Sequence, residues 1–457
     1  MTFAISATLI QTPERNQLDI RDVLIVVDGD GWIVAVHPTG TPEADAAAAA
    51  ADTCTTLPAG TVLLPGLVDL HIHAPQWPQL GTGLDLPLAD WLADYTFPLE
   101  ARFDDLDFAR TVWSDMVGSL LAHGTTTAVY FSSRHLDATT ELASICHAAG
   151  QRSFVGRVAM DHPEETPAFY RDASAQEATD LSARSIDEIR TIDPDGRLVR
   201  PIITPRFIPA CSDALLEGLG ELASASGAPV QTHCSESDWE HHHVLERFGI
   251  SDTTALERFG LLKSGTVLAH VAHAATGDLE RMAGIGVGVA HCPLSNAYFA
   301  NAVFPTLRAL DLGVPVGLGS DIAGGPSPSL LLQCHQAVTS SRMLEDGADP
   351  TRLAAERGVP LSRIDIQTAF WMATVGGARI LDLPVGLIEA GYRFDAIAVD
   401  TTSTAGPLRV WEGLDTPESI FEKVVRLAGP TEIIAVWVDG RQVVDRATTH
   451  TETARAD

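Results

Sequence analysis

The stretch LLPGLVDLHIH, residues 63–73, decides the fold of this chain. Its apolar, partly branched residues are typical of a buried strand, and it ends in two histidines, His71 and His73. Side chains two positions apart on a strand point to the same side, so both imidazoles face one way at the strand end. Three more metal-ligand side chains follow or end similar short runs: His233, His270 and Asp321. This pattern predicts a fold that gathers strand ends in one place.

Eight runs of this kind can be counted: 63–73, 125–132, 152–160, 200–207, 229–236, 266–271, 286–293 and 314–321. Stretches with helical apolar spacing separate them, such as 107–124, which a glycine closes. Near-continuous apolar strands alternating with helices predict an α/β fold with a parallel sheet covered by helices. Eight units favour a closed (β/α)8 TIM-like barrel, whose active site lies at the C-terminal ends of the strands.

Both ends of the chain carry a strand pair around an Asp-Gly turn, at 22–37 and at 432–444. We expect these hairpins to meet in one small β-sandwich domain. The expected division of the chain is 1–62 and 385–457 for the two parts of the small domain and 63–384 for the barrel. The polar tail after Arg446 is expected to fray.

Composition excludes several classes of partner. The formal net charge of -30 argues against nucleic acid, because phosphate binding depends on Lys and Arg. No apolar stretch reaches the roughly 18 residues that a membrane span needs, and no basic segment precedes the first apolar residues. Six cysteines without a C-x-x-C are typical of reduced thiols, so we expect a cytoplasmic protein.

The five strand-end side chains predict a metal site. Neutral imidazoles together with a carboxylate are typical ligands of zinc, and iron(II) can occupy similar histidine-rich sites. The predicted ligands are His71, His73, His233, His270 and Asp321. The alternative is four core histidines and a helix-capping aspartate. His270 could either bind the metal or hydrogen-bond the attacking hydroxide, and both readings stay open. A metal that activates water indicates a metal-dependent hydrolase.

Glu236 lies three residues after His233 and can lean over the metal without binding it. This is the position of a general acid/base, and the alternative is an acid in the first turn of the next helix. Asp321 can serve as both ligand and base for the activated water. Strand alternation turns Cys234 toward the helices, where it packs.

Other histidines and a glycine-rich run are weaker candidates. His291 points inward, with a substrate-side role and a structural role equally open. The triplet 241–243 is expected on a solvated helix face. The run GIGVGV, 284–289, lacks the context of a dinucleotide loop and is interpreted as packing.

The order H-x-H, His, His, Asp on a predicted (β/α)8 barrel resembles the amidohydrolase superfamily. The segment RFDAIAVD, 393–400, resembles the point where the barrel of that superfamily gives way to its small β-domain. Many members hold two metals bridged by a carboxylated lysine after the fourth strand. Here that strand ends TPRF, 204–207, and neither Lys263 nor Lys423 is near it. The resemblance therefore implies one Zn²⁺ per chain and the deaminase-like branch.

Within that branch the chain is similar to the guanine deaminases. The matching segments are 65–76, 84–98, 124–131, 204–207, 233–236, 291–296 and 317–325. Residues 84–98 and TPRF carry most of the specificity because they are not general features of the superfamily. The chain departs from the pattern at Cys234, Leu294 and Ser320, none of which is a proposed ligand. The resemblance implies a cytoplasmic homodimer that converts guanine to xanthine and ammonia in purine catabolism.

The residues that would bind guanine follow from its chemistry. Arg206 is a guanidinium fork suited to the 6-oxo group and a ring nitrogen, although a structural salt bridge is the alternative. Gln76 can both donate and accept, as a purine edge requires. Phe207 and Trp77 offer apolar surfaces to the ring, and His233 counts as a substrate contact as well as a ligand. Hydroxide would attack C2 while Glu236 protonates N3 and then the leaving amine.

Three other functions are alternatives to the deamination of guanine. The nearest is an aminohydrolase of the same branch that acts on another purine, a pterin or an aminotriazine. A non-enzymatic assembly protein on a degenerate barrel would be expected to have lost ligands, and here all are present. A binuclear cyclic-amide hydrolase is opposed by the missing lysine.

Overall fold

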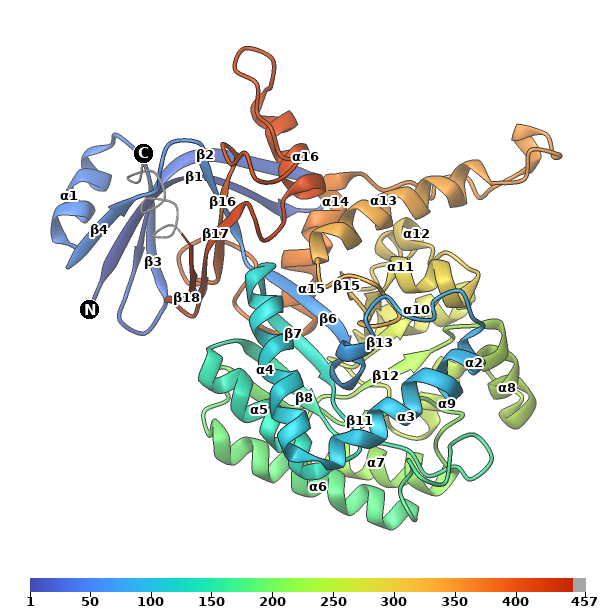
Figure 1. The fold of residues 1–457 in the computed structure, drawn as a ribbon. Coiled ribbons are helices and arrows are strands. Elements are labelled where there is room, and N and C mark those ends of the chain that lie inside the picture. The colour runs from blue at the N-terminus through green and yellow to red at the C-terminus, as the bar shows by residue number, and fades with distance from the viewer. Residues whose placement is uncertain (447–457) are drawn as a thin grey trace.

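The protein has two parts in the computed structural model, which describes residues 1–446: a helix-covered barrel and a sheet built from both ends of the chain (Figure 1). The tail after Arg446, for which fraying was expected, lies outside the described residues. No helix within residues 1–446 combines the length and the apolar character that a bilayer span requires.

The predicted barrel strands are present, and neighbouring strands pair in parallel. In chain order they are β6 (Leu67–His73), β7 (Thr125–Phe131), β8 (Arg152–Gly156) with β9 (Val158–Ala159), β10 (Val199–Pro201) with β11 (Thr204–Pro205), β12 (Gln231–Cys234), β13 (Val267–His270), β14 (Gly288–His291) and β15 (Val316–Leu318). The third and fourth predicted strands are each broken into two short pieces. The (β/α)8 class itself is confirmed.

Two sets of backbone contacts close the ring. The fourth and fifth units are joined by a parallel bridge between Ile203 and Val230. The segment after β15 returns to β6, where Asp321 N–H donates to His71 O at 2.8 Å and His73 N–H donates to Ile322 O at 2.9 Å. Three predicted ligand residues, His71, His73 and Asp321, therefore take part directly in closing the barrel.

Helices cover the outside of the barrel (Figure 1). The main ones are α4 (Leu106–Ala122), α5 (Leu136–Ala149), α6 (Ala175–Ile192), α7 (Asp213–Ser226), α8 (Asp238–Phe248), α10 (Thr276–Ile285) and α13 (Leu330–Asp346). The predicted helix 107–124 is α4. The helix begins at Leu106, after Asp105, whose side chain accepts a hydrogen bond from Asp107 N–H and so caps the helix. The buried residues of α4 repeat at helical spacing. Gly124 follows the helix with φ of +84°, as predicted from its sequence.

The two terminal hairpins belong to one sheet, as expected. β2 (Gln17–Val27) pairs with β3 (Ile33–Pro38), and β17 (Ile433–Val438) pairs with β18 (Arg441–Asp445), both antiparallel. The remaining strands are β1 (Phe3–Glu14), β4 (Thr53–Thr56), β5 (Thr61–Pro65) and β16 (Ala396–Asp400). All eight belong to one hydrogen-bonded sheet, ordered β18-β17-β16-β5-β1-β2-β3 with β4 on β1. The two faces of the expected sandwich are thus parts of a continuous sheet that shares one apolar core.

The deciding stretch 63–73 contains the end of one strand and the whole of another. β5 pairs with β1 and β16 in the terminal sheet, whereas β6 begins the barrel. Gly66 joins them, and a Cβ at this position would lie 2.2 Å from Thr126 Oγ1. The exact division of the chain into domains stays a prediction, but one of the two covalent links between its parts runs through this glycine.

Candidate active site

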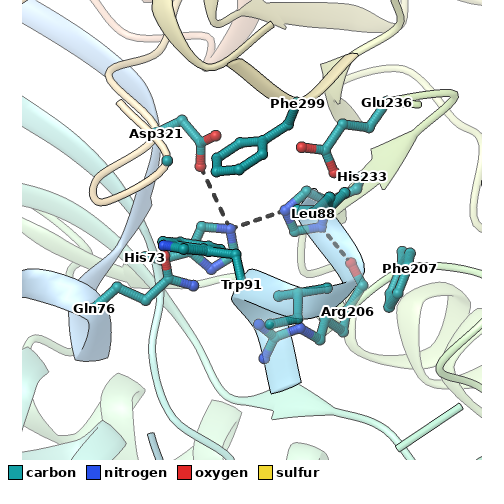
Figure 2. A pocket seen from close by; sticks show the side chains of 12 residues that line it. His73, Gln76, Leu88, Trp91, Arg206, Phe207, His233, Glu236, Phe299 and Asp321 are labelled. Atoms are coloured by element: carbon teal, nitrogen blue, oxygen red, sulfur yellow. Dashed lines mark hydrogen bonds and ion pairs between the residues drawn. The ribbon is translucent and has the colours of Figure 1, made fainter. Parts of the chain in front are cut away.

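The five predicted ligands lie together at the C-terminal ends of the barrel strands. The donor atoms of His71, His73 and His233 lie within 4.8 Å of one another, and so do those of His71, His270 and Asp321. Asp321 Oδ1 is 3.2 Å from His71 Nε2 and 3.6 Å from His73 Nε2. Its Oδ2 is 3.8 Å from His270 Nε2. Figure 2 shows His73 between Asp321 and His233, with the pocket in front of them.

Hydrogen bonds at Nδ1 orient two of the imidazoles. His233 Nδ1 is 2.6 Å from the backbone oxygen of Arg206, and His270 Nδ1 is 2.9 Å from Asn296 Oδ1. Both partners are acceptors, so each Nδ1 carries the proton and each Nε2 presents a lone pair. His73 Nε2 and His233 Nε2 then face each other at 2.9 Å. The lone pair of His233 Nε2 is thus directed at His73 Nε2, as it would be if both nitrogens were ligands of one cation.

These residues fit a zinc ion. The Nε2 atoms of His71 and His270 are buried and have no hydrogen-bond partner among the described residues. Burial lowers the pKa of His71, His73, His233 and His270, so the imidazoles are neutral, as metal ligands must be. Ligand atoms that each lie about 2 Å from one zinc ion are about 3–4 Å apart, and the separations of 2.9 to 3.8 Å among these atoms agree with this.

The backbone is strained where it carries the site. Ser235, His270, Val271 and Asp321 all have positive φ, between 47° and 69°. Such conformations cost non-glycine residues roughly 1–3 kcal/mol each and persist only where surrounding contacts impose them. Asp252 Oδ1 accepts from Ser235 N–H at 3.2 Å, one of the contacts that hold the turn after β12. The strain therefore gathers at the strand ends that present the ligands.

Glu236 lies on this turn and reaches the metal cluster. Its Oε1 is 3.6 Å from His270 Nε2, and Glu240 accepts a hydrogen bond from its backbone N–H at 2.8 Å. Helix α8 is capped by Ser237, so Glu236 is neither its cap nor in its first turn. Burial, and then the nearby Asp321 carboxylate, raise the pKa of Glu236 to about 8. A carboxyl group with that pKa can exchange a proton near neutral pH.

A pocket opens in front of the ligands, with an empty volume of about 410 Å³, part of it open to solvent. It is lined by His73, Gln76, Leu88, Trp91, Leu92, Arg206, Phe207, His233, Glu236, Phe299, Asp321 and Gly324 (Figure 2). Metal ligands and Glu236 form one side, and apolar or aromatic side chains form much of the rest. This arrangement suits a flat heterocycle whose reacting carbon faces the metal.

Arg206 and Gln76 meet at a buried carboxylate. Arg206 Nη1 and Nη2 donate to the two oxygens of Glu100, at 2.6 and 3.1 Å. Gln76 Nε2 donates to Glu100 Oε1 at 2.9 Å, and Gln76 Oε1 accepts from Ala323 N–H at 3.1 Å. The salt bridge that was the alternative role of Arg206 is therefore present, with Glu100 as its partner. Arg206 also lines the pocket.

Comparisons with known proteins agree with this geometry. The profile of the amidohydrolase family matches residues 62–443. The chain belongs to the amidohydrolase family. Among curated relatives, a probable guanine deaminase of Schizosaccharomyces pombe is 36% identical over 95% of this chain and 82% of its own length. Guanine deaminase of Homo sapiens is 35% identical over 83% of this chain and 82% of its own length. The structure of guanine deaminase from C. acetobutylicum with bound guanine has a TM-score of 0.85 at 29% identity, and covers 97% of this chain and 100% of that one.

Several candidates lie outside the pocket of this amidohydrolase. Trp77, expected to contact substrate, instead donates its indole N–H to Asp115 Oδ2 at 2.7 Å and is not among the lining residues. His291 is buried against Phe304, and burial lowers its pKa to about 3. The triplet 241–243 is half-buried or exposed on α8, and Cys234 packs in the core, both as predicted.

Other members of the site were missed. They are Leu88, Trp91 and Leu92 over the pocket, Phe299 beside it, Asn296 behind His270 and Glu100 behind Arg206. Sequence signals existed for most of these residues. The segment 84–98 and the motif HCPLSN, 291–296, match the guanine deaminases, but among their side chains the sequence suggested a role only for His291.

Proposed function

We propose that this amidohydrolase is a guanine deaminase that converts guanine and water to xanthine and ammonia. The observation that carries the proposal is one pocket lined by the His and Asp cluster, Glu236, Arg206 and Gln76. The relatives named above, over most of the chain, support the same substrate. In the reaction a C2–O bond forms and the C2–N bond to the exocyclic amine breaks.

A single Zn²⁺ would be held by His71, His73, His233, His270 and Asp321, with iron(II) as the alternative metal. When bound, such a metal lowers the pKa of water to about 7 and so supplies the nucleophile at neutral pH. Whether His270 is a direct ligand or only orients the water is left open. The two lysines of the chain, Lys263 and Lys423, donate to Ala223 and Ala228 and to Asp415 and not to the cluster residues, which supports a single ion.

Two carboxylates move the protons. Asp321 accepts one from the attacking water, since its oxygens lie among the ligand nitrogens. Glu236 delivers a proton to N3 of the purine, then takes up the proton of the new C2 hydroxyl and passes it to the amine that leaves C2, and the proton held by Asp321 restores Glu236 for the next turnover. Its carboxyl lies between His270 and the pocket, so it faces both water and substrate. The raised pKa of Glu236 suits this exchange.

The rest of the pocket would hold the base. Arg206 donates to the 6-oxo oxygen or to N7, and Gln76 offers one donor and one acceptor to the same edge. Phe207 and Phe299 present aromatic faces, and Trp91 closes the pocket from the segment before β7. Trp77 is left out of this set because its side chain is directed to Asp115.

The direct experiment is turnover by purified, zinc-loaded protein with guanine, a pterin and an aminotriazine offered separately. We expect guanine to be consumed with one xanthine and one ammonia per turnover, and at the highest kcat/KM of the three. Faster release of ammonia from either of the other amines would reassign the substrate within the family.

Two further properties are inferred from the resemblance to guanine deaminases: a cytoplasmic location and a homodimer. All six cysteines are free thiols, five of them buried, which is in keeping with a reducing compartment. Light scattering of the purified chain would test the dimer, and a monomer mass would contradict it.

A further inference from the structure

Glu100 is a buried carboxylate, and both residues that donate hydrogen bonds to it, Arg206 and Gln76, line the substrate pocket. It ends the short helix α3 (Phe97–Glu100), between the pocket segment 84–98 and α4. Its oxygens receive three hydrogen bonds, two from Arg206 and one from Gln76. Arg206 also lies 5.0 Å above the ring centroid of Phe97.

The pair with Arg206 fixes a guanidinium that would otherwise be costly to bury. An uncompensated buried charge destabilises strongly, and a bidentate carboxylate is the partner that matches the fork. Arg206 is 3% exposed, and Glu100 is its only ion-pair partner among residues 1–446. Two of the five N–H donors of Arg206 are used in this way, so the others remain for a ligand.

The contact with Gln76 fixes the orientation of an amide. Its Nε2 faces the Glu100 carboxylate, and its Oε1 faces the N–H of Ala323. A flipped amide would direct oxygen at a carboxylate and an NH₂ group at an N–H, so both contacts would become repulsive. One N–H and one lone pair of Gln76 are thus left in a fixed direction.

We propose that Glu100 is a positioning residue that sets substrate specificity. It holds Arg206 and Gln76 together so that both can hydrogen-bond to the edge of the purine that carries the 6-oxo group. This rests on the proposed function. Glu100 itself touches no substrate, since its oxygens already accept hydrogen bonds from Arg206 and Gln76. Removing the Glu100 carboxylate frees the side chains of both Arg206 and Gln76. This weakens the binding mainly of ligands that carry the 6-oxo group.

The test compares Glu100→Gln and Glu100→Asp with the wild type on guanine and on 2-aminopurine, which lacks the 6-oxo group. Glu100→Gln places an NH₂ group against the guanidinium or the amide, whereas Glu100→Asp keeps the charge. We expect Glu100→Gln to lower kcat/KM for guanine by about 10²-fold, chiefly through KM, as loss of a charge-assisted contact would. Turnover or competitive binding of 2-aminopurine should change less than about fivefold. Glu100→Asp should recover part of the loss.

The matched control is Asp395→Asn. Asp395 is also buried and accepts two hydrogen bonds from one guanidinium, that of Arg152, at 3.1 and 3.2 Å. It lies at the boundary with the terminal sheet, where it accepts from Asp439 N–H. This variant should lower thermal stability without changing the preference for guanine over 2-aminopurine.

The proposal is overturned if Glu100→Gln and Glu100→Asp weaken both purines equally, or if their loss of activity follows loss of zinc or of folded protein. An inactive wild type would sink the proposed function instead. In that case calorimetric binding of guanine and 2-aminopurine decides: Glu100 keeps its role only if Glu100→Gln selectively weakens guanine.

Discussion

Glu236 and Asp321 are the two carboxylates among the residues that line the pocket, and they differ in their position relative to the metal ligands. Asp321 lies among the ligand nitrogens, whereas Glu236 reaches the edge of the cluster beside His233 and His270. Glu236→Gln keeps the shape and the hydrogen bonding but cannot exchange a proton. We expect kcat to fall by at least ~10²-fold with zinc content unchanged, as is usual for a lost general acid/base. Near-normal turnover would remove Glu236 from the mechanism.

Asn296 acts through His270, because its Oδ1 fixes the Nδ1 proton of that ring. Partners of this kind typically change metal affinity by about 10–100-fold. Asn296→Leu should therefore weaken zinc binding by that factor, measured by competition with a chromogenic chelator. Asn296→Asp keeps an acceptor and should retain the metal. Equal affinity in all three proteins would mean that His270 is not a ligand.

Among single residues, the sequence predicted those that a pattern of neighbouring residues indicates. His71 and His73 share a strand face, and Asp321 follows a short apolar run, so spacing alone indicated them. Glu100 and Asn296 carry no such signal, since each matters only through a partner far away in the chain. Trp77 was expected either to contact the ring or to cover the barrel mouth, and the short 3₁₀ turn after β6 directs its indole to Asp115 of α4.

Among the elements, the link between β5 and β6 is a closely packed point of the fold that positions the ligands. A methyl group on Gly66 would collide with the side chain of Thr126. We expect Gly66→Ala to lower thermal stability, and Gly118→Ala in α4 to raise it by up to ~1 kcal/mol, because Gly118 is helical and has open space around its Cα. Thermal melts of both variants check this, and an unchanged Gly66→Ala would show that Thr126 yields easily.

The strands were predicted in number and order but not in their breaks. Residues 152–160 read as one apolar strand, yet the strand is interrupted at Arg157, whose guanidinium forms a buried ion pair with Asp172. Hydrophobic periodicity reports which faces are buried and carries no information about such an interruption. The same limit applies to 200–207, where Ile203 leaves one ladder to bridge Val230.

In the whole molecule, the terminal sheet and the barrel are tied by buried charges as well as by Gly66. Arg152 of β8 meets Asp395 and Asp439, which flank strands of the terminal sheet. The Asp-Gly turns made the two hairpins predictable from sequence. That all eight strands join one sheet was not, because the end of β5 lies inside the stretch that was expected to be a single barrel strand.

The most direct test of the account is to strip the purified protein of metal and titrate zinc back while xanthine and ammonia are measured with guanine as substrate. The account predicts no turnover without metal and a linear rise that ends at one zinc per chain, with Glu236→Gln binding the same one zinc and staying inactive. A plateau at two zinc ions per chain, or no guanine turnover with one zinc bound, would contradict it.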